Sequence, residues 1–270
     1  MSLCIAVVTP EGIIVAGESR QTQTIAGINR TSSDSALKVF ELTKSVVAAT
    51  AGWAFLQPQG STVQKNISGV VEDFKTTIPE GSSVKEIATL LWQYFNTAYQ
   101  QHIAQLPSSA LEAGVTAINF MVAGYGSPAS EGQLYGIDIP STEAPSTPVR
   151  STNGVTGPWW IGQVDVLSRV LKGYDYRAND FAFFQAALQN PSDKALINGL
   201  EFSIFSNTMT LQDAIDFAVE MIRVTITVQR FTAGIMSNLG SVAGVGGPID
   251  IVVLRPGREL LWVARKQLHP

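Results

Sequence analysis

Residues 2–17 read SLCIAVVTPEGIIVAG, two short apolar runs joined by a Pro-Glu-Gly turn. β-branched residues are frequent in both runs, and such runs around a Pro/Gly turn are typical of a β-hairpin. Two further segments, Ala36–Leu42 and Ser45–Ala51, have a similar composition. We therefore predict that the first fifty residues fold mainly as β-sheet, with Glu18 at the end of the second strand and Lys38 within the third.

The hydrophobic period then changes to that of helices. Apolar residues recur at helical spacing from Ser61 to Phe74, and again after Ser83, where Glu86 completes the pattern of a capping box. A further helix is predicted from Leu211 to Phe231. Strands are predicted at Val115–Gly124, Gln133–Ile139, Pro248–Leu254 and Glu259–Ala264.

This order of elements predicts an α+β class, with helices packed outside stacked sheets. No shift in composition or run of charge divides the chain, so we expect one domain, residues 1–270. The segment between Gly173 and Asn207 is polar and aromatic by turns, and its pattern predicts no particular element.

Composition excludes several classes of function. The 270 residues hold 18 Lys and Arg against 22 Asp and Glu, and the net charge of −4 gives no basic surplus for nucleic acid. No apolar run reaches the roughly 18 residues of a membrane span, and no signal-peptide pattern opens the chain. We expect a cytoplasmic globular protein without a nucleic-acid or membrane partner.

Cysteine and histidine are nearly absent. Cys4 is alone, so neither an intramolecular disulfide nor zinc spacing around it is expected. His269 lies at the chain end, so a Ser-His-Asp triad would have to use His102. We expect His102 itself at the surface or at an interface. No cofactor is expected either, since the glycine-rich stretch Gly240–Gly247 lacks the continuation of a phosphate loop.

Ser2 offers a mechanism that needs no histidine. Removal of Met1 would leave a serine with a free α-amine, whose usual pKa of about 7.7–8.0 lets it accept the hydroxyl proton. Glu18 and Lys38 could hold a proton network beside it, and the N–H of Gly52 could face an oxyanion. Taken singly, each of these residues has an ordinary alternative. Serine is common after the initiator methionine, and Glu18 could be a solvated residue at a strand end. Lys38 could face outward from its strand, and Gly52 could simply serve a turn.

Together these motifs resemble those of proteasome β-type subunits. In that family a nucleophilic Thr precedes Gly-Ala-Asp-Ser/Thr-Arg-x-Thr, a Lys-Ile pair and an Ala-Gly-x-Ala segment. The corresponding segments of this chain are Val15-Ala-Gly-Glu-Ser-Arg-Gln-Thr22, Leu37-Lys-Val-Phe40 and Thr50-Ala-Gly-Trp-Ala54. Later segments, among them Gly246-Gly-Pro-Ile-Asp-Ile-Val-Val253, keep the family order, so the resemblance covers most of the chain. Bacterial proteasome homologues of the Anbu kind are the branch it resembles.

The resemblance implies an N-terminal-nucleophile hydrolase with a four-layer αββα sandwich, acting on a peptide or other amide within a homo-oligomer. By motif position, Ser2 would be the nucleophile and its amine the base, Lys38 would tune the hydroxyl, and Glu18 would orient Lys38. The N–H of Gly52 would stabilise the oxyanion. Gln21 and Thr22 would contact the substrate.

The chain also departs from the family pattern. Ser2 replaces a threonine and Glu18 an aspartate, and Gln163 stands where a Gly-Ser-Gly element supplies a hydroxyl. A later Asp-x-x-Ser-Gly element is missing, with Arg223 or Thr225 near the expected Asp. Two alternatives therefore stay open: a catalytically silent subunit of the same fold, and an amidase for small molecules.

Overall fold

The structure is a computed structural model that describes residues 2–25, 28–58, 60–107, 117–126, 131–232 and 242–267. Two five-stranded sheets dominate it, and every strand pair in them is antiparallel. The first sheet has the order β12 (Gly157–Gly162), β1 (Leu3–Thr9), β2 (Gly12–Gly17), β13 (Asp250–Leu254), β14 (Leu261–Ala264). The second has the order β11 (Arg150–Ser151), β10 (Gly132–Ile139), β9 (Ile118–Tyr125), β6 (Val46–Gly52), β5 (Val39–Thr43).

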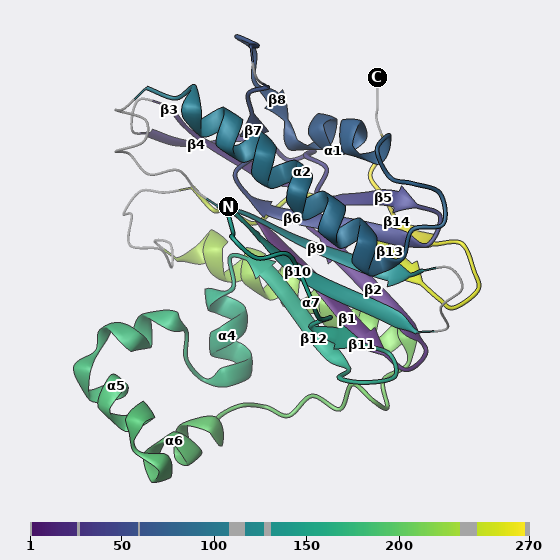
Figure 1. The fold of residues 1–270 in the computed structure, drawn as a ribbon. Coiled ribbons are helices and arrows are strands. Elements are labelled where there is room, and N and C mark those ends of the chain that lie inside the picture. The colour runs from purple at the N-terminus through teal and green to yellow at the C-terminus, as the bar shows by residue number, and fades with distance from the viewer. Residues whose placement is uncertain are drawn as a thin grey trace.

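Two short ribbons accompany the sheets. They pair β3 (Gln21–Ile25) with β4 (Ile28–Ser33) and β7 (Phe55–Leu56) with β8 (Lys65–Asn66). The helices are α1 (Ile67–Lys75), α2 (Val84–Ala104), α4 (Asp165–Lys172), α5 (Ala182–Gln189), α6 (Pro191–Asn198) and α7 (Leu211–Phe231), with a 3-10 turn at Tyr176–Asp180. The chain is thus a mixed α/β protein with antiparallel sheets (Figure 1).

Three groups of buried apolar side chains hold the layers together. One lies between the two sheets and includes Ala6 and Val47. Another joins α1 and α2 to the second sheet, around Phe95 and Phe120 with ring centroids 4.5 Å apart. The third joins α4 and α7 to the first sheet and includes Ile222. Each sheet therefore has one face against the other sheet and one face against helices.

This position explains the composition of the first hairpin. Every residue of β1 and β2 is buried, because both faces of these central strands are covered. Strands of this kind are apolar throughout rather than alternating. The predicted hairpin is confirmed, and its residues pair in register from Thr9 opposite Gly12 to Cys4 opposite Gly17.

Helix starts follow the capping residues. The capping box at Ser83 is confirmed, with the Glu86 carboxylate accepting from the Ser83 N–H at 2.7 Å. The long helix α7 has the predicted bounds and its own capping box at Thr210. The prediction of a helix from Ser61 was wrong in its start: α1 begins at Ile67 because the Asn66 side chain caps it, and Val63 is 70% exposed.

The segment with no predicted element forms a helical lobe, residues 174–205, that projects from the side of the sheets (Figure 1). Helices α5 and α6 have no buried residue. A buried carboxylate, Asp175, ties the lobe to its base by pairing with Arg169 of α4 and with Arg177 at 2.7 Å. These two guanidinium groups hold the pKa of Asp175 well below its usual range, mainly through the hydrogen bond from Arg177.

Across the described ranges, the longest and most apolar helices still fall short of what a bilayer crossing requires.

Candidate functional site

The first hairpin places Ser2 and Glu18 side by side. Ser2 directly precedes β1 and Glu18 directly follows β2, and antiparallel pairing brings these strand ends together. The N–H of Leu3 donates to the Glu18 carboxylate at 3.1 Å. Lys38 reaches the same point from just before β5, where its carbonyl accepts from the Thr50 N–H at 2.9 Å.

Glu18 and Lys38 form a buried ion pair. Glu18 has no exposed surface and Lys38 is 5% exposed. Besides the Lys38 ammonium, the Glu18 carboxylate accepts the backbone N–H groups of Arg20 at 2.7 Å and Gly246 at 2.9 Å. The ammonium also donates to the Arg20 carbonyl. The placement of Lys38 inside a strand was wrong, and so was its outward-facing alternative, because β5 begins one residue later and the side chain points inward.

A cavity of about 40 Å³ lies beside this pair. It has room for a few water molecules, since one needs roughly 10–15 Å³ of such volume. Its lining includes Ser2, Lys38, Gly52, Gln21 and Thr22, with Trp53 and Asn66 among the others. The structure thus brings five of the six predicted site residues to one cavity, and the sixth, Glu18, supports Lys38 from behind.

Two glycines near Ser2 allow neighbouring backbone segments to approach each other closely. At Gly52, φ is +101°, and an added Cβ would lie 2.0 Å from the Ala117 carbonyl oxygen. At Gly162, φ is +97°, and a Cβ would lie 2.0 Å from the carbonyl oxygen of Ser2. The next N–H, that of Gln163, donates to that same oxygen at 2.6 Å. Gln163 therefore borders Ser2.

Sequence reasoning missed the support that comes from distant residues. The Arg20 guanidinium pairs with Asp34 through two contacts, at 2.7 and 2.9 Å, and lowers the pKa of that carboxyl. The Ser19 hydroxyl donates to the carbonyl of Pro248 at 2.6 Å, close to the Gly246 N–H that reaches Glu18. The Gly-Gly-Pro run at residues 246–248, shortly before β13, is the sequence feature that could have predicted this contact.

Other nucleophile and base candidates are unsuitable. Burial raises the pKa of the Cys4 thiol to about 12, so it stays protonated at neutral pH. The expected exposure of His102 was wrong: its ring is fully buried on α2, its Nδ1 accepts from the Gln57 N–H at 3.2 Å, and burial lowers its pKa. Met1, His269 and Gly240–Ser241 lie outside the described residues.

The two residues near the missing family element also lie away from the cavity. Arg223 is exposed on α7 and pairs with Glu220 at 2.6 Å. Thr225 is buried, and its hydroxyl donates to the Met221 carbonyl at 3.0 Å. Neither lines the Ser2 cavity. In the described part of the chain, no three His, Cys, Asp or Glu side chains gather as they would around a metal ion.

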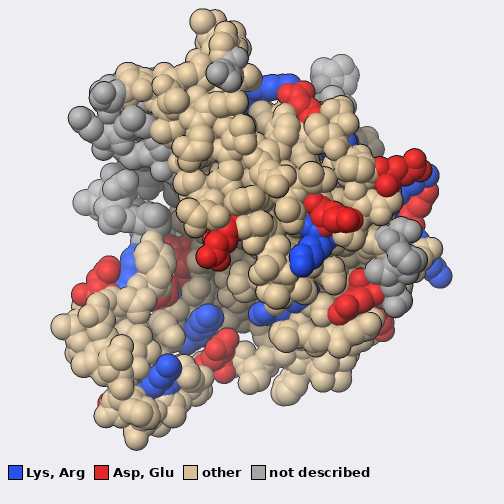
Figure 2. All heavy atoms as spheres, in the orientation of Figure 1, with Lys and Arg blue, Asp and Glu red and all other residues tan. Residues whose placement is uncertain are grey.

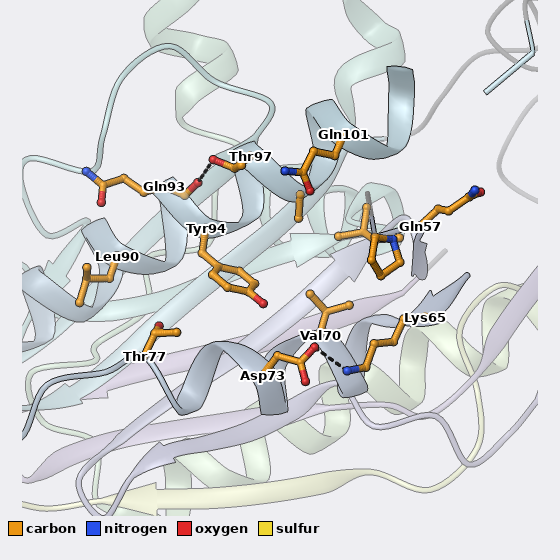
Figure 3. Close-up of a pocket in the computed structure, with 13 residues that line it drawn as sticks. Gln57, Lys65, Val70, Asp73, Thr77, Leu90, Gln93, Tyr94, Thr97 and Gln101 are labelled. Carbon is orange, nitrogen blue, oxygen red and sulfur yellow. Dashed lines mark hydrogen bonds and ion pairs between the residues drawn. The ribbon is translucent and has the colours of Figure 1, made fainter. Parts of the chain in front are cut away.

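A larger pocket of about 460 Å³ lies between α1 and α2. In Figure 3, Tyr94 of α2 extends toward α1, whose Asp73 forms an ion pair with Lys65 of β8. The short β7–β8 ribbon separates this pocket from the Ser2 cavity, because Leu56 and Lys65 line the pocket whereas Asn66 lines the cavity.

Comparison with known proteins supports the fold. No protein-family model matches the sequence, and no curated protein sequence matches it. Among solved structures, the fold is similar to that of the Anbu (Gly-1) mutant from Hyphomicrobium sp. strain MC1, with a TM-score of 0.51 and 13% sequence identity. The similarity covers 97% of this chain and 85% of that one. It establishes a distant relationship in fold to a bacterial proteasome-like protein.

Proposed function

We propose that this chain is an N-terminal serine amide hydrolase of the proteasome-like kind, acting as a peptidase. The observation that carries the proposal is the buried Glu18–Lys38 pair, whose lysine lines the same cavity as Ser2. A buried ion pair needs several hydrogen bonds to be maintained, and an ammonium held in this way on the cavity of Ser2 favours a chemical role. The layers of helix, sheet, sheet and helix would then be the αββα sandwich of such hydrolases, with residues 1–270 as one domain.

The mechanism follows from the groups around the cavity. After Met1 is removed, the α-amine of Ser2 accepts the hydroxyl proton while Oγ attacks the substrate carbonyl carbon. Lys38 stabilises the negative charge developing on Oγ, and Glu18 holds the ammonium in place. The Gly52 N–H would stabilise the oxyanion. The amine then passes the proton to the leaving nitrogen, and a water molecule, activated by the same amine, hydrolyses the acyl ester.

Gln21 and Thr22 would contact the substrate. Both begin β3, next to the cavity, and an extended peptide could lie beside such a strand. Asn66, which also lines the cavity, contacts the Gln21 side-chain oxygen at 3.4 Å. No cofactor or metal takes part in the proposed reaction.

One observation favours the catalytically silent alternative. A cavity of about 40 Å³ is far below the roughly 300–1,000 Å³ of ordinary ligand pockets, so a substrate could enter only if neighbouring segments move apart. On that reading the chain is a scaffold subunit with a residual site. An amidase for small molecules would need a smaller opening than a peptidase.

Intact-mass spectrometry with a serine-reactive fluorophosphonate tests the proposal. We expect protein from its own cells to lack the mass of one methionine and to gain one probe adduct on Ser2. Retained Met1 together with no adduct would establish the silent subunit instead. An adduct combined with turnover of acylated amino-acid amides, but of no peptide, would establish the amidase.

The lobe supports a homo-oligomer as part of the proposal. Apart from Phe202, six large apolar side chains of residues 174–205 are more than half exposed: Tyr176, Phe181, Phe183, Leu196, Leu200 and Phe205. At roughly 100–150 Å² each, their exposed area approaches the ~800 Å² that each partner contributes to a stable interface. Helices of eight residues, such as α5 and α6, have marginal stability unless they pack against something. A second copy of the chain could cover their exposed apolar side chains. In Figure 2 most atoms on the visible face of this lobe belong to uncharged residues, with a few acidic and basic side chains among them.

Replacing Phe183 and Leu196 together with glutamate should break this contact. We expect light scattering after gel filtration to show a shift from oligomer to monomer, because charges would enter an apolar interface. The matched control is Phe231→Glu, which changes a phenylalanine of similar exposure outside the lobe (74% against 73%) and should leave the mass unchanged. An oligomer that survives the double change would place the interface elsewhere.

A further inference from the structure

A third cavity, of about 620 Å³, lies between β12 and the lobe. Its lining comes from Arg150 of β11, from residues 156–160 in and before β12, and from Leu171 and Lys172. Residues between 198 and 206, at the C-terminal end of the lobe, complete it. It is separate from the Ser2 cavity. Pairing of β1 with β12 places Val8 opposite Gly157 at this end and Leu3 opposite Gly162 at the other, about 17 Å away at 3.3–3.4 Å per residue.

Arg150 is the unusual residue of this cavity. Its guanidinium lies over the Trp159 ring at 5.4 Å, and one of its terminal nitrogens donates to the Val149 carbonyl at 2.7 Å. Within the described ranges no carboxylate lies within 4.0 Å of it, and its Nε is buried without a hydrogen-bond partner. Burial lowers its pKa. A guanidinium has five donors, and leaving it partly desolvated and unpaired is unfavourable.

The other residues of the lining indicate which kind of ligand could pair with the Arg150 guanidinium. Arg150 and Lys172 are positive and Glu201 is negative, so the lining carries a net charge of +1, which suits a monoanion better than a dianion. The Thr156 and Ser206 hydroxyls, 2.9 Å apart, add polar contacts. The apolar lining is formed by Trp159, Trp160, Leu171, Phe202 and Ile204.

We propose that this cavity binds a monocarboxylate with an apolar or aromatic body, anchored by Arg150. The planar guanidinium matches a carboxylate through two parallel hydrogen bonds. The body of the ligand packs against the tryptophans of β12. The volume fits a small molecule or the end of a peptide. This site is independent of Ser2 and of the hydrolase proposal.

Isothermal titration calorimetry on the full chain tests the inference, with Ser2→Ala present to prevent turnover. The probes are N-acetyl-L-phenylalanine, its uncharged amide and inorganic phosphate. We expect saturable binding of the carboxylate and at least about 30-fold weaker binding of the amide. Failure of the carboxylate to saturate, or equal binding of the amide, would overturn the proposal. Phosphate binding more tightly than the carboxylate would overturn the ligand class.

The residue is tested by Arg150→Met, with Lys44→Met as the control for loss of a positive charge at an exposed site. The Arg150 variant should lose at least about 30-fold in affinity for N-acetyl-L-phenylalanine, and the control should lose none. Thermal unfolding without ligand gives a second readout. We expect the midpoint of Arg150→Met to be equal or higher, because an unpaired charge leaves the interior. A clear fall in that midpoint would show that Arg150 supports the fold instead.

Discussion

Replacing Ser2 with alanine is expected to lower kcat/KM for peptide hydrolysis by at least about 10³-fold, because Ser2 is the one hydroxyl residue of the cavity lining, beside Thr22 and Thr50, that would carry its own α-amine as base. Lys38 is held by Glu18, and the nearby Cys4 is buried and protonated. A panel of fluorogenic peptides gives the measurement. The alanine variant should fold normally, since the change removes a single hydroxyl and adds no atom to the buried position.

Two further variants make this result specific. Ser2→Thr keeps the hydroxyl and adds a methyl group that restrains its rotamer, so we expect activity to persist. Ser192→Ala changes an exposed serine of α6 and should have no effect. Hydrolysis that is unchanged in Ser2→Ala would mean that the nucleophile lies elsewhere. Absence of hydrolysis in the unaltered protein, over the whole panel, would favour the silent subunit.

The sequence was sufficient to predict elements whose residues carry their own signal. The Pro-Glu-Gly turn and the unbroken apolar runs predicted the first hairpin, and the capping residues Ser83 and Glu86 predicted the start of α2. The part of the site that lies at strand ends was also predictable. Ser2 and Glu18 must meet once β1 pairs with β2.

The remainder depended on contacts between distant segments. Lys38 reads as an ordinary residue of an alternating strand, and only the packing of β5 against the first sheet shows that it is buried. Arg150 likewise carries no sequence signal, because only the way in which the lobe packs near β12 shows that no described carboxylate pairs with it. The lobe itself lacks a clear helical face, since its short helices bury no side chain within this chain.

Replacing Lys38 with methionine is expected to have the second large effect, because it leaves the Glu18 carboxylate buried without a cation. Breaking such a pair usually costs about 3–5 kcal/mol in free energy of unfolding. We expect the lower end here, since Glu18 would still accept three backbone N–H groups. Urea denaturation measures this loss. Peptide hydrolysis should fall by about 10²–10³-fold, the usual cost of removing one group that stabilises developing negative charge.

The double variant Lys38→Met with Glu18→Gln separates the two effects. Neutralising the carboxylate should recover part of the lost stability, whereas hydrolysis should stay low because no ammonium faces the Ser2 hydroxyl. Lys44→Met is the matched control, since Lys44 and Glu259 form a pair that is exposed to solvent and should contribute little to stability. If Lys38→Met lost stability but kept full activity, the buried pair would serve the fold alone, and the case for a catalytic Ser2 would lose its main structural support.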